Sequence, residues 1–118
     1  MALPKIRIVP SAEPKEEQRS PGVLSRGLAF SDKVMMFETH IKAGSERPVH
    51  AHPHDQVGYV VKGEMELIVT GNQPYACKVG DSFSVPGGVQ HSIRAIKDTV
   101  IVDAFNQVPQ PPKDGSAD

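Results

Sequence analysis

Turn-forming residues interrupt this chain so often that no long regular helix fits between them. The sequence contains 10 glycines and 11 prolines among 118 residues, and both residue types favour turns over helix interiors. No helical periodicity extends beyond a turn or two, whereas the segments between the turns are rich in β-branched and aromatic residues. We therefore expect an all-β chain with short strands at residues 23–30, 34–41, 57–61, 64–70, 75–79, 82–85, 91–96 and 99–105.

One of these segments also indicates which way its side chains face. Between residues 64 and 70, Met65, Leu67 and Val69 alternate with Glu64 and Glu66. Such alternation is typical of a strand with one buried side and one solvent-facing side. Short strands joined by regular turns indicate a sandwich or barrel, and a chain of this length is expected to form one domain.

The two ends of the chain differ from this central region. Residues 1–22 combine several prolines with a charged run, which predicts an N-terminal arm. Within the arm, residues 6–9 are β-prone and could add a strand to the chain's own sheet or an exchanged strand to a neighbouring one; the alternative is a loosely tethered tail. Residues 106–118 are polar and proline-rich, which predicts a flexible C-terminal tail. The barrel itself is expected to span residues 23–105.

Composition argues against several kinds of partner. The formal net charge is −1 and no basic stripe is present, so nucleic acid is not an expected partner. No apolar run is as long as a membrane helix requires, and the N-terminus lacks the apolar core of a signal peptide; we expect a cytoplasmic protein. Cys77 is the single cysteine, which fits a reducing compartment, and we interpret it as a half-buried strand residue rather than a nucleophile.

Histidines supply the candidate chemistry. His50, His52 and Gln56 lie at even spacings, so on an extended backbone they share one face and can converge on one interior point. A further imidazole must come from another strand, and His91 is the obvious candidate. The competing interpretation is that these side chains line a polar barrel without a metal. We expect His40 to be structural or exposed, and His54 to face solvent or support the ligands.

Two stretches of the sequence resemble the signature motifs of the cupin superfamily, which usually read G-x5-H-x-H-x3,4-E-x6-G and G-x5-P-x-G-x2-H-x3-N. The matching positions here are Gly44, His50, His52, Gln56 and Gly63, followed by Gly80, Pro86, Gly88 and His91. The resemblance implies a single-domain double-stranded β-helix, or jelly-roll barrel. It also implies one divalent transition metal held by His50, His52, Gln56 and His91.

Two positions depart from the family motifs. Ala95 replaces the usual Asn, which we expect to affect only a turn. Gln56 replaces the usual Glu, and a neutral amide leaves the full double charge on the metal, so we expect weaker metal binding and a preference for an anionic ligand. Four protein ligands leave two positions open on an octahedral ion. Imidazole ligands suit Zn, Ni, Fe and related ions, and the sequence does not choose among Zn, Ni, Fe and Mn.

Within the cupins, the stretch from His50 to Glu64 is similar to the pectin-degradation cupins, which linearise unsaturated uronates. In that family a D-x-F segment on a late strand is implicated in turnover and an Arg follows it. Asp103 and Phe105 match D-x-F, but Pro109 stands where the Arg is sought. The resemblance implies that Asp103 is a catalytic general acid or base; the alternative is a surface or turn carboxylate. Phe105 is expected to belong to the core.

The leading functional hypothesis is a metal-dependent enzyme that acts on a small anionic, sugar-derived or keto-acid substrate. Its sharpest form is an isomerase-type or lyase-type reaction in which the ring of an unsaturated uronate is opened or tautomerised. Two alternatives stay open, an Fe(II) dioxygenase and a non-catalytic cupin that binds a small ligand. The resemblance also implies a homodimer.

Overall fold

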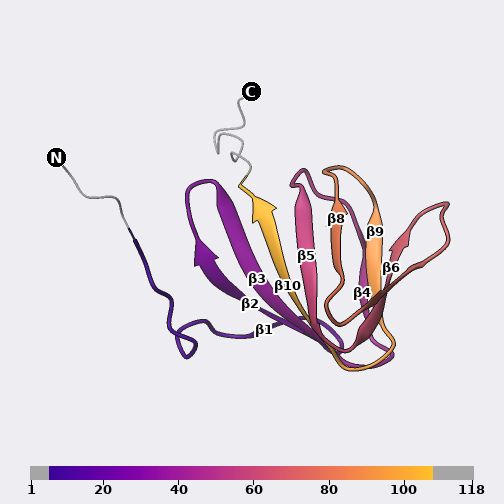
Figure 1. Cartoon of the computed structure of the whole chain (residues 1–118), viewed down its shortest axis with the longest axis horizontal. Helices are drawn as coiled ribbons and strands as arrows, with labels where there is room; N and C mark the ends of the chain where they lie inside the picture. Colours follow the sequence, from indigo (N-terminus) through magenta and orange to yellow (C-terminus); the bar gives the residue numbers. More distant parts are fainter. Residues whose placement is uncertain (1–5, 108–118) are drawn as a thin grey trace.

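The structure is a computed structural model that describes residues 6–107, and this part of the chain contains strands and no helix. The prediction of an all-β fold is therefore confirmed. In chain order (Figure 1) the strands are β1 (Glu17–Ser20), β2 (Val23–Phe30), β3 (Val34–Ile41), β4 (Glu46–His50), β5 (Gln56–Lys62), β6 (Glu64–Val69), β7 (Tyr75–Lys78), β8 (Ser82–Val85), β9 (His91–Ala95) and β10 (Thr99–Asn106).

The strands form two antiparallel sheets that face each other as a jelly roll. The larger sheet has the order β1-β2-β3-β10-β5-β8 and the smaller one has the order β4-β9-β6-β7. In Figure 1 the larger sheet occupies the left and centre of the view, with β6 and β9 of the smaller sheet at the right. Non-consecutive neighbours such as β3 and β10 pair along their whole length, so segments distant in sequence meet at the centre of the molecule.

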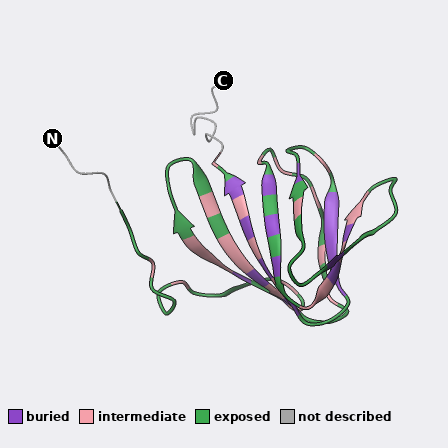
Figure 2. Cartoon of the chain, in the orientation of Figure 1, coloured by how far each residue is buried: buried purple, intermediate pink, exposed green. Residues whose placement is uncertain are grey.

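Along β5 and β10, side chains alternate between the interior of the molecule and its outer surface. Along β5, Gln56, Gly58 and Val60 are buried while the residues between them are exposed, and Figure 2 shows this as alternating colours on the strand. Each Å² of apolar surface that a strand buries stabilises the fold by about 25 cal/mol. The inward faces of both sheets supply the core: Val23, Ile41, Val60, Met65, Leu67, Cys77, Val85, Ile93, Ala95 and Ile101.

The predicted strands agree closely with those observed, and β2, β3 and β8 have the expected bounds. Met65 and Leu67 are buried, as the alternation in β6 predicted. Gly63 lies between β5 and β6 and has a φ of 90°, in the left-handed region that favours glycine. A Cβ at Gly63 would collide with the backbone of Asp98, so this turn requires glycine.

Two strands were not predicted from the sequence. β1 lies inside the predicted arm and pairs with β2 at the edge of the larger sheet, and β4 precedes the histidines. Residues 6–9 form no strand in the structure. An exchanged strand and the division into arm, barrel and tail stay predictions, and residues 108–118 of the tail lie outside the described part of the chain. Over residues 6–107, no helix is long and apolar enough to cross a membrane.

Candidate metal centre

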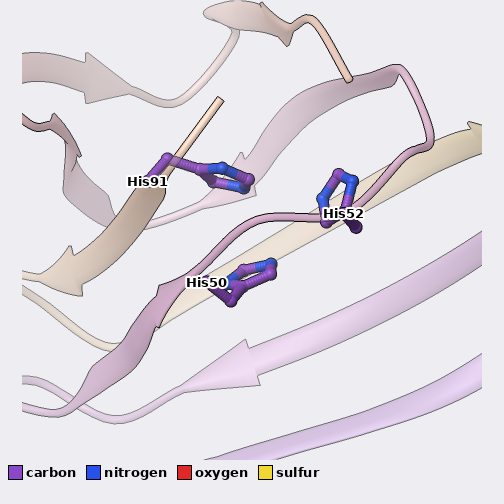
Figure 3. A group of neighbouring side chains, drawn as sticks. All are labelled: His50, His52 and His91. Carbon is purple, nitrogen blue, oxygen red and sulfur yellow. The ribbon is translucent and has the colours of Figure 1, made fainter. Parts of the chain in front are cut away.

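Three histidines gather where the two sheets open at one end of the barrel. His50 ends β4 and pairs in register with His91, which begins β9. His52 lies in the loop that leads from β4 into β5. One ring nitrogen from each histidine lies within 4.8 Å of the others, and Figure 3 shows the three rings gathered around a common point. The structure thus brings together the histidines that the motifs singled out.

Backbone carbonyl groups fix the orientation of all three rings. The Nδ1 atoms of His50, His52 and His91 lie 3.0, 2.9 and 2.8 Å from the carbonyl oxygens of Pro48, His54 and Val89. A carbonyl oxygen only accepts hydrogen bonds, so each Nδ1 carries the proton in the neutral ring. The lone pair of each neutral imidazole is therefore on Nε2. A ring held in this way is a ready metal ligand.

The polar atoms at the centre of this cluster fit a cation. The Nε2 atom of His52 is buried and has no hydrogen-bond partner among the described residues. The Nε2 atom of His91 lies 3.1 Å from the Oε1 atom of Gln56, and both atoms carry lone pairs in the neutral state. Buried acceptors that face each other are costly unless something positive lies between them. This donor set of imidazoles and an amide oxygen suits a divalent transition metal.

The orientation of Gln56 is set by its other neighbour. Gln56 begins β5 and is almost completely buried, and its Nε2 group donates a hydrogen bond of 3.1 Å to the Oδ1 atom of Asp103. An ionised carboxylate accepts hydrogen bonds and donates none. The amide nitrogen therefore faces Asp103 and the amide oxygen faces the histidines. A Glu at position 56 would place two carboxylates in contact, which gives a physical reason for the departure from the motif.

Asp103 lies inside β10 rather than at a surface turn. It is 1% exposed, and its Oδ2 atom lies 3.4 Å from the guanidinium of Arg47, which comes from β4 in the opposite sheet. Burial raises the pKa of the Asp103 carboxyl, while the charge of Arg47 and the hydrogen bond from Gln56 act in the opposite direction. The structure therefore excludes the alternative of an exposed carboxylate.

Burial also controls the histidines themselves. Desolvation lowers the pKa of His50 and of His91, and the nearby positive charge of Arg47 lowers both further. The hydrogen bonds to the backbone carbonyls oppose this effect only in part. Both rings are therefore biased towards the neutral form that a metal requires.

The loop that carries His52 is held from two sides. The carbonyl oxygen of His52 accepts a hydrogen bond of 2.7 Å from the backbone N–H of Gly88, and the carboxylate of Asp55 accepts one of 2.8 Å from Gly87. Asp55 also donates its own N–H to the side chain of Asn106 at the end of β10. The loop after β8 and the end of β10 thus fix the position of the histidine loop.

The remaining histidines lie outside the cluster. The Nδ1 atom of His54 lies 2.8 Å from the carbonyl oxygen of Asn106, and the residue is half-buried at the edge of the cavity. His40 lies on β3, where its Nε2 atom is 3.0 Å from the carboxylate of Glu38. Both placements agree with the supporting or exposed roles expected from the sequence. Phe105 is buried, as expected, and its ring is 5.4 Å from that of His52.

A cavity of about 420 Å³ opens beside the cluster. His50, His52 and Asp103 line it together with apolar side chains that include Met35 and Phe37. The sequence analysis missed a further lining residue, Arg47. A break in the regular pairing between Arg47 and His50 changes which face β4 presents, so counting even spacings could not find it.

Comparison with known proteins places this site in a family. The cupin domain model matches residues 37–105, and the chain belongs to the cupin family. It is similar to the pectin degradation protein KdgF of Dickeya dadantii, with 27% identity over 92 residues that cover 76% of this chain and 83% of that protein.

Solved structures give the same result. An RmlC-like cupin from Shewanella frigidimarina is 29% identical, with a TM-score of 0.79 over 90% of this chain and 95% of the other. KdgF from a Halomonas species is 25% identical, with a TM-score of 0.80 over 90% of this chain and 97% of the other. The jelly-roll fold is therefore confirmed, and so is the expected resemblance to the pectin-degradation cupins.

Proposed function

We propose that this chain is a metal-dependent cupin enzyme that opens or tautomerises the ring of a small anionic, sugar-derived substrate. The observation that carries the proposal is the cluster of three imidazoles, with the amide oxygen of Gln56 3.1 Å from the Nε2 atom of His91 and the amide nitrogen of Gln56 hydrogen-bonded to Asp103. The similarity to the pectin degradation protein KdgF supports an unsaturated uronate as the substrate.

His50, His52, Gln56 and His91 would hold the metal. A divalent ion bound there supplies Lewis acidity, which polarises a carbonyl or hydroxyl group. The protein's own contribution is to keep its imidazoles neutral and aimed inward through the carbonyl groups of Pro48, His54 and Val89. Gln56, His91 and Asp103 are almost completely buried, which strengthens the electrostatic interactions among them.

Asp103 is the proposed proton carrier. Its carboxylate lines the cavity, and burial raises its pKa above the ordinary value, which makes it a better base than an exposed aspartate. It accepts a hydrogen bond from Gln56, so its orientation is fixed relative to the metal ligands. In the proposed reaction, Asp103 takes a proton from the substrate and returns it at a neighbouring atom.

The test is turnover of unsaturated galacturonate by metal-loaded protein, followed by NMR. Wild type should consume the cyclic form faster than the uncatalysed reaction. His91→Ala should lose both bound metal and activity, whereas Asp103→Asn should keep the metal and lose activity by roughly 100-fold or more. No acceleration by wild type would dismiss the uronate reaction. Bound iron together with substrate-dependent oxygen uptake would instead support the alternative function, an Fe(II) dioxygenase.

We also propose a homodimer formed through the outer face of the larger sheet. Outward side chains on its central strands make an apolar surface: Met36, Val57, Tyr59, Val61, Val102 and Ala104. Val57 and Tyr59 are each about half exposed, at 53% and 51%, and contiguous patches of this kind mark interaction sites. A mass of one chain by light scattering at micromolar concentration would refute the dimer, and Tyr59→Lys should disrupt it.

A further inference from the structure

Two arginines from opposite sheets face the same cavity. Arg47 reaches it from β4 in the smaller sheet, and Arg19 reaches it from β1 at the edge of the larger sheet. Asp103 is the only acidic side chain among the described residues that line this cavity. The side chains of the cavity therefore carry a net positive charge when both arginines and Asp103 are ionised.

Arg47 has free hydrogen-bonding capacity. Its guanidinium makes one hydrogen bond among the described residues, a long contact of 3.4 Å from Nη1 to the Oδ2 atom of Asp103. A guanidinium carries several N–H donors in a planar fork, so most of them stay available. The side chain is only 22% exposed, which means that its charge is partly withdrawn from water and acts on its surroundings with little screening.

The positive charge of Arg47 affects the pKa of other residues in the site. It lowers the pKa of His50 and of His91, and it opposes the rise in the pKa of Asp103. Arg47 is thus close enough to act together with the proposed metal ligands. An anion that bound between Arg47 and the histidine cluster would meet the guanidinium on one side and, in the metal-loaded protein, the cation on the other.

Arg19 is held in place at the more exposed side of the cavity. Its Nε group donates a hydrogen bond of 2.7 Å to the hydroxyl of Ser25 on β2, and its Nη1 lies 3.2 Å from the carboxylate of Glu17. The side chain is 51% exposed, so its charge is screened more strongly than that of Arg47. It is suited to attract an anion rather than to fix its geometry.

We propose that Arg47 binds the carboxylate of the substrate through its guanidinium fork, and that Arg19 assists its entry. This inference rests on the proposed function and adds to it the group that selects carboxylates over neutral sugars. The apolar side chains of the cavity, Met35, Phe37 and Phe105, provide a surface for the C–H face of a sugar ring. The substrate would then lie with its carboxylate on Arg47 and its reacting atoms towards His50 and Asp103.

The experiment measures binding without turnover. D-galacturonate and D-galactose, which differ in the carboxylate, are titrated by NMR into wild type, Arg47→Gln, Arg47→Lys and Arg94→Gln. Arg94 pairs with Glu66 on the outward side of β9, so its variant removes the same charge away from the cavity. Each protein is titrated both metal-loaded and chelator-treated, with metal content and thermal midpoint recorded as checks on folding.

Wild type should prefer galacturonate by about 10- to 100-fold, as expected for a charged hydrogen-bonded pair. Arg47→Gln should lose most of that preference in both metal states, Arg47→Lys should keep part of it, and Arg94→Gln should match wild type. Arg19→Gln should reduce affinity by a smaller factor and mainly at low salt. With unsaturated galacturonate, Arg47→Gln should raise KM more than it lowers kcat.

Three results would overturn the inference: no preference for galacturonate in wild type, an unchanged preference in folded Arg47→Gln, or a preference that vanishes only when metal is removed. Failure of the proposed reaction is distinguishable from failure of the inference. If wild type does not turn over unsaturated galacturonate but loses its carboxylate preference in Arg47→Gln, Arg47 is the carboxylate site of an enzyme or binding protein with another carboxylate ligand.

Discussion

Gln56 connects the two halves of the site because its amide has one donating and one accepting end. The nitrogen donates to Asp103 and the oxygen faces His91. A glutamate in its place would offer acceptors to both neighbours. Glutamine therefore suits position 56 better than the usual glutamate because of Asp103, a residue 47 positions away in the sequence.

The first prediction tests this dependence in metal-free protein. Gln56→Glu should lower the free energy of unfolding by roughly 1–3 kcal/mol, because it leaves a buried carboxylate without a donor. Adding Asp103→Asn should recover most of the loss, because the asparagine amide can donate to the new glutamate. Urea denaturation of the two single variants and the double variant gives the coupling. Equal stability of Gln56→Glu and wild type would contradict the explanation.

A second prediction concerns pH. Burial lowers the pKa of His50 and of His91 from the ordinary value of 6.5, so below that pH the unfolded chain binds more protons than the folded one. The stability of metal-free protein should therefore fall as the pH is lowered from about 7 towards 5, by at most about 1.4 kcal/mol per pH unit for each histidine. Denaturation at a series of pH values measures the slope.

The variant His91→Gln supplies the control for this pH dependence. Removing one of the two histidines with a lowered pKa should make the slope shallower. His40→Gln should change it little, because His40 lies on β3 beside Glu38 and outside the cluster. The same slope in His91→Gln and wild type would show that other groups are responsible.

At the scale of strands, the sequence predicted much of the framework. Alternation and turn residues located β2, β3, β6 and β8, because their side chains alternate locally between core and solvent. The two motifs also predicted which histidines gather, but the expectation that His50, His52 and Gln56 share one face of an extended strand was wrong. His50 ends β4, His52 lies in a loop and Gln56 begins β5 in the other sheet. β1 was missed because its four residues are mostly exposed and carry no apolar alternation.

Contacts between strands distant in sequence could not be predicted in the same way. Asp103 lies beside Gly58 because β10 pairs with β5 in one particular register. Arg47 faces the cavity because β4 has an irregularity before His50. Neither fact leaves a local signal in the sequence, since each depends on how two separated strands align.

The close approach of β5 and β10 gives a third prediction. A Cβ at Gly58 would collide with the ring of Phe83 and the carboxylate of Asp103. Gly58→Ala should therefore destabilise the protein by about 1–3 kcal/mol and weaken metal binding by displacing Asp103 from Gln56. Calorimetry and metal titration measure the two effects.

Gly27→Ala is the matched control in β2. There the nearest atom to a new Cβ is a ring carbon of Phe30 at 3.2 Å, and this half-exposed ring can move aside. A small loss of stability with normal metal binding is expected. If Gly58→Ala behaved in the same way, the packing of Gly58 against Asp103 would not matter for the site.

In the whole molecule, the candidate metal centre spans the two sheets. His50 and His91 belong to the smaller sheet through β4 and β9, while Gln56 belongs to the larger sheet through β5. A metal bound by all of them would join the sheets at the open end of the barrel, where Arg47 and Asp103 also meet across the gap. Ligand binding of this kind stabilises only the folded state, because the unfolded chain does not bring the ligands together.

The last prediction follows from this cross-sheet arrangement. At a free metal concentration about 100-fold above the dissociation constant, wild type should gain roughly 2.7 kcal/mol of stability, seen as a higher thermal midpoint than in chelator-treated protein. His91→Ala should lose most of the gain, and Gln56→Ala should lose part of it, because the imidazoles remain. His40→Ala, on the outer face of β3, should respond to metal as wild type does. A similar gain in His91→Ala would place the stabilising metal elsewhere in the protein.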